Sequence, residues 1–78
     1  MHNRVIFSYS TEHLASSGKV RFFYALNGRN NLKGLLDRTK TERVGRAVLI
    51  VRPNFVIEMR DFLNYWKCKW KELPVMVE

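Results

Sequence analysis

The sequence has little of several features that mark particular protein classes. Its one cysteine excludes an internal disulfide framework, and with only two histidines a closed zinc site is not expected. No run approaches the roughly 18 apolar residues of a membrane span, and the first residues lack the apolar stretch of a signal peptide. We therefore expect a cytoplasmic protein with no metal, no other cofactor and no membrane partner.

Glutamine is absent while lysine and arginine are plentiful, a bias typical of proteins from thermophiles. The length of 78 residues fits a single domain, residues 1–78, with a core of marginal size. An apolar content of 46% is too high for a disordered chain. Composition thus indicates a small folded domain.

Acidic residues are scarce in the middle of the chain. Residues 19–52 hold nine basic and two acidic side chains, a net charge of +7, while the flanks balance with five of each sign. A cationic field concentrated in this way attracts a polyanion, and nucleic acid is the most common one in a cell. The alternative is a solvated surface, which usually carries compensating acids.

Two strands are expected at the start of the chain. Residues 4–9 are mainly β-branched and aromatic, as in strands. After a polar connection, residues 19–26 fit a second strand, whose alternation places Arg21 and Phe23 on one cationic face. The other face would be core and carries Val20, Phe22, Tyr24 and Leu26.

The segment that follows allows two interpretations. The pair Asn27-Gly28 is a turn signal. Residues 32–43 then fit a helix that Gly45 would end, while the alternative is a hairpin with residues 32–36 as its return strand. We favour the helix.

The last third of the chain has the clearest pattern. Residues 46–52 place five apolar residues between two arginines, as in a strand buried on both faces. A helix follows from Pro53-Asn54, with one apolar stripe. Residues 68–77 fit a final strand, which Pro74 places at a sheet edge. The expected class is α+β, a small single-domain sheet of about four strands with one or two helices packed on one face.

No enzymatic signature is complete, so we do not expect an enzyme. The run Ser17-Gly18-Lys19 ends like a phosphate loop but lacks its first glycine and its final Ser/Thr. No catalytic partner is identifiable for His13. Cys68 lies between two lysines, which would activate an exposed thiol; a small buried residue is the favoured interpretation.

Basic residues interleaved with aromatic ones are the positive signal. Cations contact phosphates, while bases stack on aromatic rings with little regard to sequence. Phe23 and Trp70 each have core packing as an open alternative. The candidate nucleic-acid-binding residues are Lys19, Arg21, Phe23, Arg29, Lys33, Arg38, Lys40, Arg43, Arg46 and Trp70.

Five runs spread over roughly residues 8–70 share a likeness with one family. They are Tyr9-Ser10-Thr11 with Leu14, Lys19 to Leu26 with Gly28-Arg29, Gly34-Leu35-Leu36, Val44 to Val48, and Phe62-Leu63-x-x-Trp66. Together they resemble the ThermoDBP-type single-stranded DNA-binding proteins of archaea and their relatives. The resemblance implies a compact sheet-and-helix domain that binds single strands through basic and aromatic residues and forms oligomers.

By this resemblance, the implicated residues are Lys19, Arg21, Phe23, Arg29 and Arg46. The longer members have a C-terminal heptad helix, which does not occur up to Glu78, so assembly through a zipper is not expected. Two functions stay open. The first is sequence-tolerant binding of single-stranded DNA or RNA, and the second is a basic ribosomal or ribonucleoprotein component that binds folded RNA.

We also expect a homodimer or a higher homo-oligomer. The chain is small, and its C-terminal third holds more aromatic residues than one helix stripe can bury, with Tyr65 outside the stripe. The final strand has an apolar run, Val75-Met76-Val77, at an edge that needs a cover or a partner. A symmetric contact there would leave the basic middle free.

Overall fold

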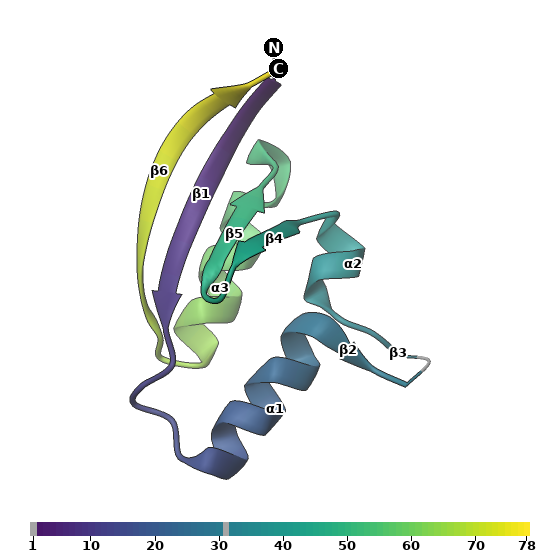
Figure 1. Ribbon diagram of the computed structural model, residues 1–78, viewed down its shortest axis with the longest axis vertical. Coiled ribbons are helices and arrows are strands. Elements are labelled where there is room, and N and C mark those ends of the chain that lie inside the picture. The colour runs from purple at the N-terminus through teal and green to yellow at the C-terminus, as the bar shows by residue number, and fades with distance from the viewer. Residues whose placement is uncertain (1, 31) are drawn as a thin grey trace.

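The computed structural model describes residues 2–30 and 32–78 and has the expected α+β class (Figure 1). A four-stranded antiparallel sheet has the order β4-β5-β1-β6, and a separate two-stranded ladder joins β2 to β3. The strands are β1 (His2–Ser10), β2 (Gly28–Arg29), β3 (Leu32–Lys33), β4 (Glu42–Gly45), β5 (Val48–Val51) and β6 (Lys69–Val77). The helices are α1 (Ser16–Asn27), α2 (Leu35–Thr39), the 3-10 turn η1 (Pro53–Phe55) and α3 (Val56–Tyr65).

Strand β1 is the centre of the sheet. It pairs with β6 along its whole length and with β5 over residues 5–8, so that Phe7 lies between Leu49 and Glu72. The strands expected over 4–9 and 68–77 are confirmed, and β6 is an edge strand as predicted. The strand expected over 46–52 begins later, at Val48, because residues 46 and 47 form the β4–β5 turn.

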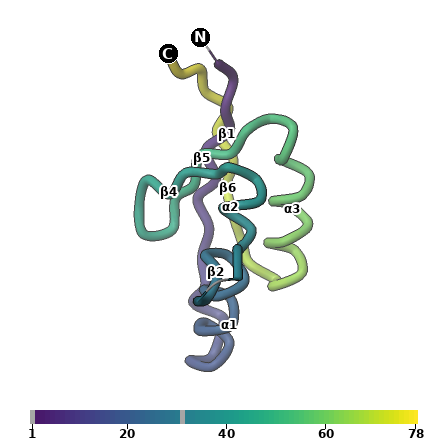
Figure 2. Tube along the Cα trace, turned by 90° about the vertical axis from the view of Figure 1, so that its right-hand side faces the viewer, coloured from purple at the N-terminus to yellow at the C-terminus, as the bar shows by residue number. Residues whose placement is uncertain are grey.

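Helix α3 packs against one face of the sheet, and Figure 2 shows the helix on one side of the strands. Phe7, Leu49, Val51, Met59 and Leu63 are fully buried between the two layers. The apolar stripe predicted for this helix is therefore confirmed. None of the helices in the described residues is both long and apolar enough to cross a membrane.

Residues 19–26 form a helix, so the predicted second strand is wrong. Phe22 and Leu26, one helical turn apart, are buried, whereas Val20 and Tyr24 are exposed. The Phe22 ring centroid lies 5.5 Å from that of Tyr9, and α3 supplies further ring contacts. These tertiary contacts outweigh the strand propensity of the segment.

Both interpretations of the following segment are partly right. Gly28 and Arg29 pair with Leu32 and Lys33 as a short hairpin, and a helix of only five residues, α2, follows. The predicted helix over 32–43 is therefore too long. Gly45 does not end it, because α2 already ends at Thr39 and the next residue, Lys40, is in the left-handed region with φ 51°.

Candidate nucleic-acid interface

A hollow of about 570 Å³ lies between helix α1 and the β4–β5 turn. Three segments meet there: the end of β1 with the loop after it, the N-terminal half of α1, and the strand β4 with its turn. Its lining residues are Tyr9, Ser10, Thr11, Glu12, Lys19, Phe22, Phe23, Arg43, Arg46 and Ala47. Four of the predicted binding residues, from two distant parts of the sequence, thus share one concave surface.

Helical spacing places the α1 residues of this hollow on one side. Lys19, Phe22 and Phe23 are three and four residues apart, and so lie one turn apart on the same face of a helix. Phe22 is 4% exposed and forms the floor, while Phe23 is 50% exposed and presents its ring to solvent. The choice left open for Phe23 is thus resolved in favour of an exposed ring.

Two arginines and three aromatic rings contact one another along this surface. The Arg43 guanidinium carbon lies 5.6 Å from the centroid of the Phe23 ring, and Arg43 Nη2 donates a hydrogen bond of 3.3 Å to Tyr9 Oη. The Phe23 and Tyr24 rings meet edge to face at 6.3 Å, and the Arg29 guanidinium lies 4.8 Å over Tyr24. We name the five residues Arg29, Tyr24, Phe23, Arg43 and Tyr9 the cation–aromatic row.

The cations of this surface outnumber its acids. The ion pairs among residues 2–30 and 32–78 are Arg38 with Glu58 and Arg60 with Glu72, so neither arginine of the cation–aromatic row has a carboxylate partner there. One carboxylate, that of Glu12, lines the hollow beside Lys19 and Arg46. The surface is therefore cationic, and the two arginines of the cation–aromatic row are held by rings rather than by acids.

Several predicted binding residues lie elsewhere. Arg21 is exposed on α1 but two residues from Phe23, about 200° around the helix, so the predicted shared face is wrong. Arg38 forms an ion pair of 3.4 Å with Glu58, which reduces its value as a phosphate ligand. Lys33 on β3 and Lys40 after α2 are exposed and outside the hollow.

Trp70 is not an exposed indole. It is half-buried on the α3 side of the sheet, where its Nε1 donates a 2.9 Å hydrogen bond to Glu72. Arg60 donates two further hydrogen bonds of 2.7 Å to the same carboxylate, and these hold the pKa of Glu72 below its ordinary value. The core alternative for Trp70 is the right one.

Cys68 is 5% exposed, and burial raises the pKa of its thiol. The prediction of a small buried residue is therefore confirmed, and an activated thiol is not.

Within residues 2–30 and 32–78, no three side chains of the metal-ligating types gather into a site.

Two members of the cation–aromatic row, Tyr9 and Tyr24, were absent from the predicted site. The strand interpretation of residues 19–26 assigned Tyr24 to the core, whereas helical spacing places it at the surface. A helical reading of Phe22 and Leu26 would have grouped Lys19 with Phe23, but contact with Tyr9 and Arg43 depends on tertiary structure.

The chain matches no protein-family model, no curated protein and no solved structure. The resemblance to the ThermoDBP-type family therefore stays a prediction, carried by the residues quoted for it.

Proposed function

We propose that this protein binds single-stranded nucleic acid, with little sequence preference, along the cation–aromatic row. The observation that carries the proposal is the half-exposed Phe23 ring, set among cations that form no ion pair in the part of the chain that the structure describes. Rings accept any base by stacking, for about 1–3 kcal/mol each, while cations contact phosphates. We also propose that the protein is cytoplasmic, as expected from the sequence.

The row favours a single strand over a duplex for a steric reason. A ring stacks only on a base whose face is free, and in a duplex the base faces are covered by their neighbours. Phe23 and Tyr24 present two adjacent rings, 6.3 Å apart, to solvent. They therefore suit two unstacked bases of one strand.

Arg43 links the two kinds of contact. Its guanidinium rests on the Phe23 ring in the free protein. When a nucleic-acid base displaces the guanidinium and stacks on the Phe23 ring, the guanidinium stays nearby and can contact the phosphates of the same strand. Lys19 and Arg46, at the rim of the same hollow, supply further phosphate contacts.

A fluorescence anisotropy titration with matched single-stranded DNA, single-stranded RNA and duplex tests the proposal. We expect both single strands to bind more tightly than the duplex. If four to six phosphates are neutralised, log K should fall with log salt at a slope of roughly −3 to −4, because each phosphate contributes about −0.7. No binding at low salt, or a slope near zero, would contradict the proposal, and a preference for folded RNA would favour a ribonucleoprotein component.

We also propose that two copies associate through the C-terminal third of the chain. Tyr65 is 80% exposed and Met76 is 62% exposed, and the nine-residue edge strand β6 has an unpaired outer side. A second copy would cover these apolar groups and leave the cation–aromatic row free. Light scattering at micromolar concentration should give twice the chain mass of 9.3 kDa. A mass that stays at the monomer value on concentration would contradict it.

A further inference from the structure

A second basic surface lies on the sheet face opposite α3. In the register of β1 with β6, Ser8 is directly opposite Lys71, and Ser10 is directly opposite Lys69. Cross-strand neighbours point to the same side of a sheet. We name these four residues the serine–lysine ladder.

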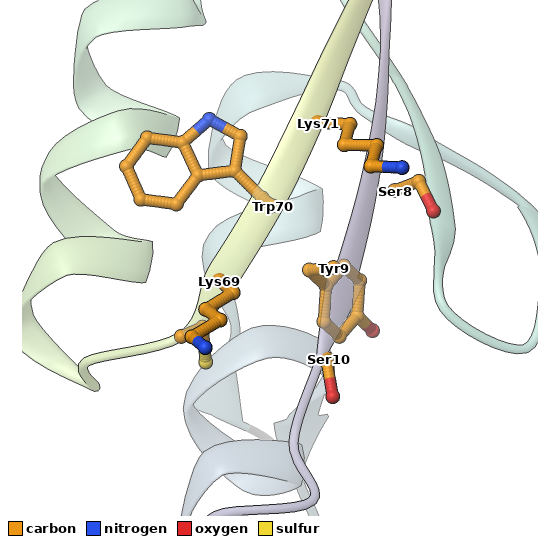
Figure 3. Close-up of a pocket in the computed structure, with 7 residues that line it drawn as sticks. Ser8, Tyr9, Ser10, Lys69, Trp70 and Lys71 are labelled. Carbon is orange, nitrogen blue, oxygen red and sulfur yellow. The ribbon is translucent and has the colours of Figure 1, made fainter.

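The ladder is on the open side because the residues between its members point the other way. Tyr9 and Trp70, which pair with each other between the two rungs, face the core and α3. Figure 3 shows Trp70 on one side of β6 and Lys71 on the other, where it reaches across β1 toward Ser8. The two rungs are two residues apart, which corresponds to about 7 Å along the strands.

The ladder lines a hollow of about 690 Å³ that contains no acidic residue. Lys69 and Lys71 are both exposed, and neither forms an ion pair within the part of the chain that the structure describes. The nearest acid along β6, Glu72, faces α3 and is held by Arg60 and Trp70. Glu12, which follows β1, lines a separate hollow with Ser10 and Lys69 and forms no ion pair within the described residues. The ladder thus presents two ammonium groups and two hydroxyls, which are donors suited to phosphate oxygens.

This hollow adjoins the hollow of the cation–aromatic row at the end of β1. Tyr9 and Ser10 line both hollows, so the row ends where the ladder begins. The path turns around the end of β1, from the α1 side to the open face of the sheet. Two aromatic residues, Tyr9 and Trp70, also line this hollow, but both pack against the core. In contrast to the row, the ladder therefore presents no ring on its outer side among the residues that the structure describes.

We propose that a strand bound at the cation–aromatic row continues past Ser10 onto the serine–lysine ladder. This rests on the proposed function and extends its site. Lys69 and Lys71 contact phosphates of the continuing strand, and the hydroxyls of Ser8 and Ser10 donate to the same oxygens. Without rings, the ladder holds the backbone only. It therefore adds affinity for longer strands and no preference for any base.

The test compares labelled oligothymidylates of about four and about twelve nucleotides, lengths at the two ends of common single-strand site sizes. In the double variant Lys69→Ala/Lys71→Ala, the shorter probe should bind as in the unchanged protein. For the longer probe, the slope of log K against log salt should become shallower by about 1.4. This corresponds to an affinity about 25-fold weaker at about 0.1 M salt. Replacement of both lysines by arginine should restore the longer probe.

Arg4→Ala is the matched control. Arg4 is on the same sheet face, opposite Val75, but four residues from Ser8, about 13 Å along β1. The Arg4→Ala substitution removes one positive charge from that face and leaves the ladder unchanged, so both probes should bind as before. An equal loss with Arg4→Ala and with either single lysine variant would show a general charge effect and overturn the proposal.

The two proposals fail in different ways. If the unchanged protein binds neither probe, the proposed function is wrong. If both probes bind and the double lysine variant leaves the longer one unaffected, the continuation is wrong and the row stands. An equal loss of both probes, with an unchanged melting temperature, also overturns the continuation, because the lysines would then belong to one short site.

Discussion

Arg43 and Arg60 are both exposed arginines, yet their surroundings are opposite. Arg60 donates two hydrogen bonds of 2.7 Å to Glu72, while Arg43 rests 5.6 Å over the Phe23 ring and donates to Tyr9. A carboxylate neutralises an arginine, whereas a ring holds it and leaves its charge available to a phosphate. The contact between α3 and β6 therefore uses its charges for structure, and the surface between α1 and β4 keeps them free.

The aromatic residues divide in the same way. Phe22 packs against Tyr9 and against Phe62 and Trp66 of the α3 segment, with ring centroids 5.4 to 5.6 Å apart. Phe23, the next residue, is half-exposed beside Arg43. Two adjacent phenylalanines thus belong to the two different regions, which makes them the sharpest pair for mutagenesis.

The largest effect is expected for Phe22→Ala. Removal of a buried ring from the contact of α1 with α3 should cost about 3–5 kcal/mol of unfolding free energy. Chemical denaturation followed by circular dichroism measures it. A loss below about 1 kcal/mol would show that α1 does not depend on this ring.

Phe23→Ala should instead change binding. Loss of a stacking ring should cost about 1–3 kcal/mol in affinity for a short single strand, with the salt slope unchanged. Its unfolding free energy should change by no more than about 0.5 kcal/mol, as for other surface positions. Phe23→Trp, which retains a ring, is the matched control and should bind as before.

The assignment of Phe22 to the core and Phe23 to the binding surface is contradicted if Phe23→Ala lowers the melting temperature as much as Phe22→Ala does. Phe23 would then be a structural residue, and the distinction between the two regions would not hold at α1.

The sequence alone predicts the α3–β6 region well and the α1 region badly. The α3 stripe combines a proline start with apolar residues at helical spacing, so local pattern and tertiary structure agree. In α1, the run from Val20 to Leu26 alternates as a strand does. Its N-cap, Ala15, makes no side-chain hydrogen bond, and its first turn has no acid, so the usual start signals are missing.

The candidate site follows from the same distinction. The charge of residues 19–52 predicts a cationic surface, because charge needs no knowledge of the fold. It does not predict which cations meet. Arg38 is adjacent to Glu58 and Arg43 to Tyr9 only in the folded chain, through contacts between residues 20 and 34 positions apart.

A smaller effect is expected on acidification. Because Arg60 and Trp70 hydrogen-bond the ionised Glu72, its pKa in the folded state lies below the ordinary 4.5. The contribution to stability is complete above that ordinary value and is lost as the pH falls through the lowered pKa of the folded state. Melting temperature against pH should show this loss.

Glu72→Gln is the control for that loss. It should cost up to about 1 kcal/mol near neutral pH, as for an ion pair that solvent still reaches, and should remove this part of the acid dependence. Since Glu72 lies outside the proposed binding site, oligonucleotide affinity should stay unchanged. A loss of affinity would mean that the two sides of the molecule are coupled.

The smallest effect distinguishes two cations of α1. Lys19 lines the hollow of the cation–aromatic row, while Arg21 lies two residues further, about 200° around the helix. Lys19→Ala should reduce the magnitude of the salt slope for a short single strand by about 0.7, the value of one phosphate contact. Arg21→Ala removes the same charge from the same helix and should leave the slope unchanged. Equal slopes for the two variants would show that the strand responds to the overall field of the domain, and would remove the distinction between a defined row and a diffuse basic surface.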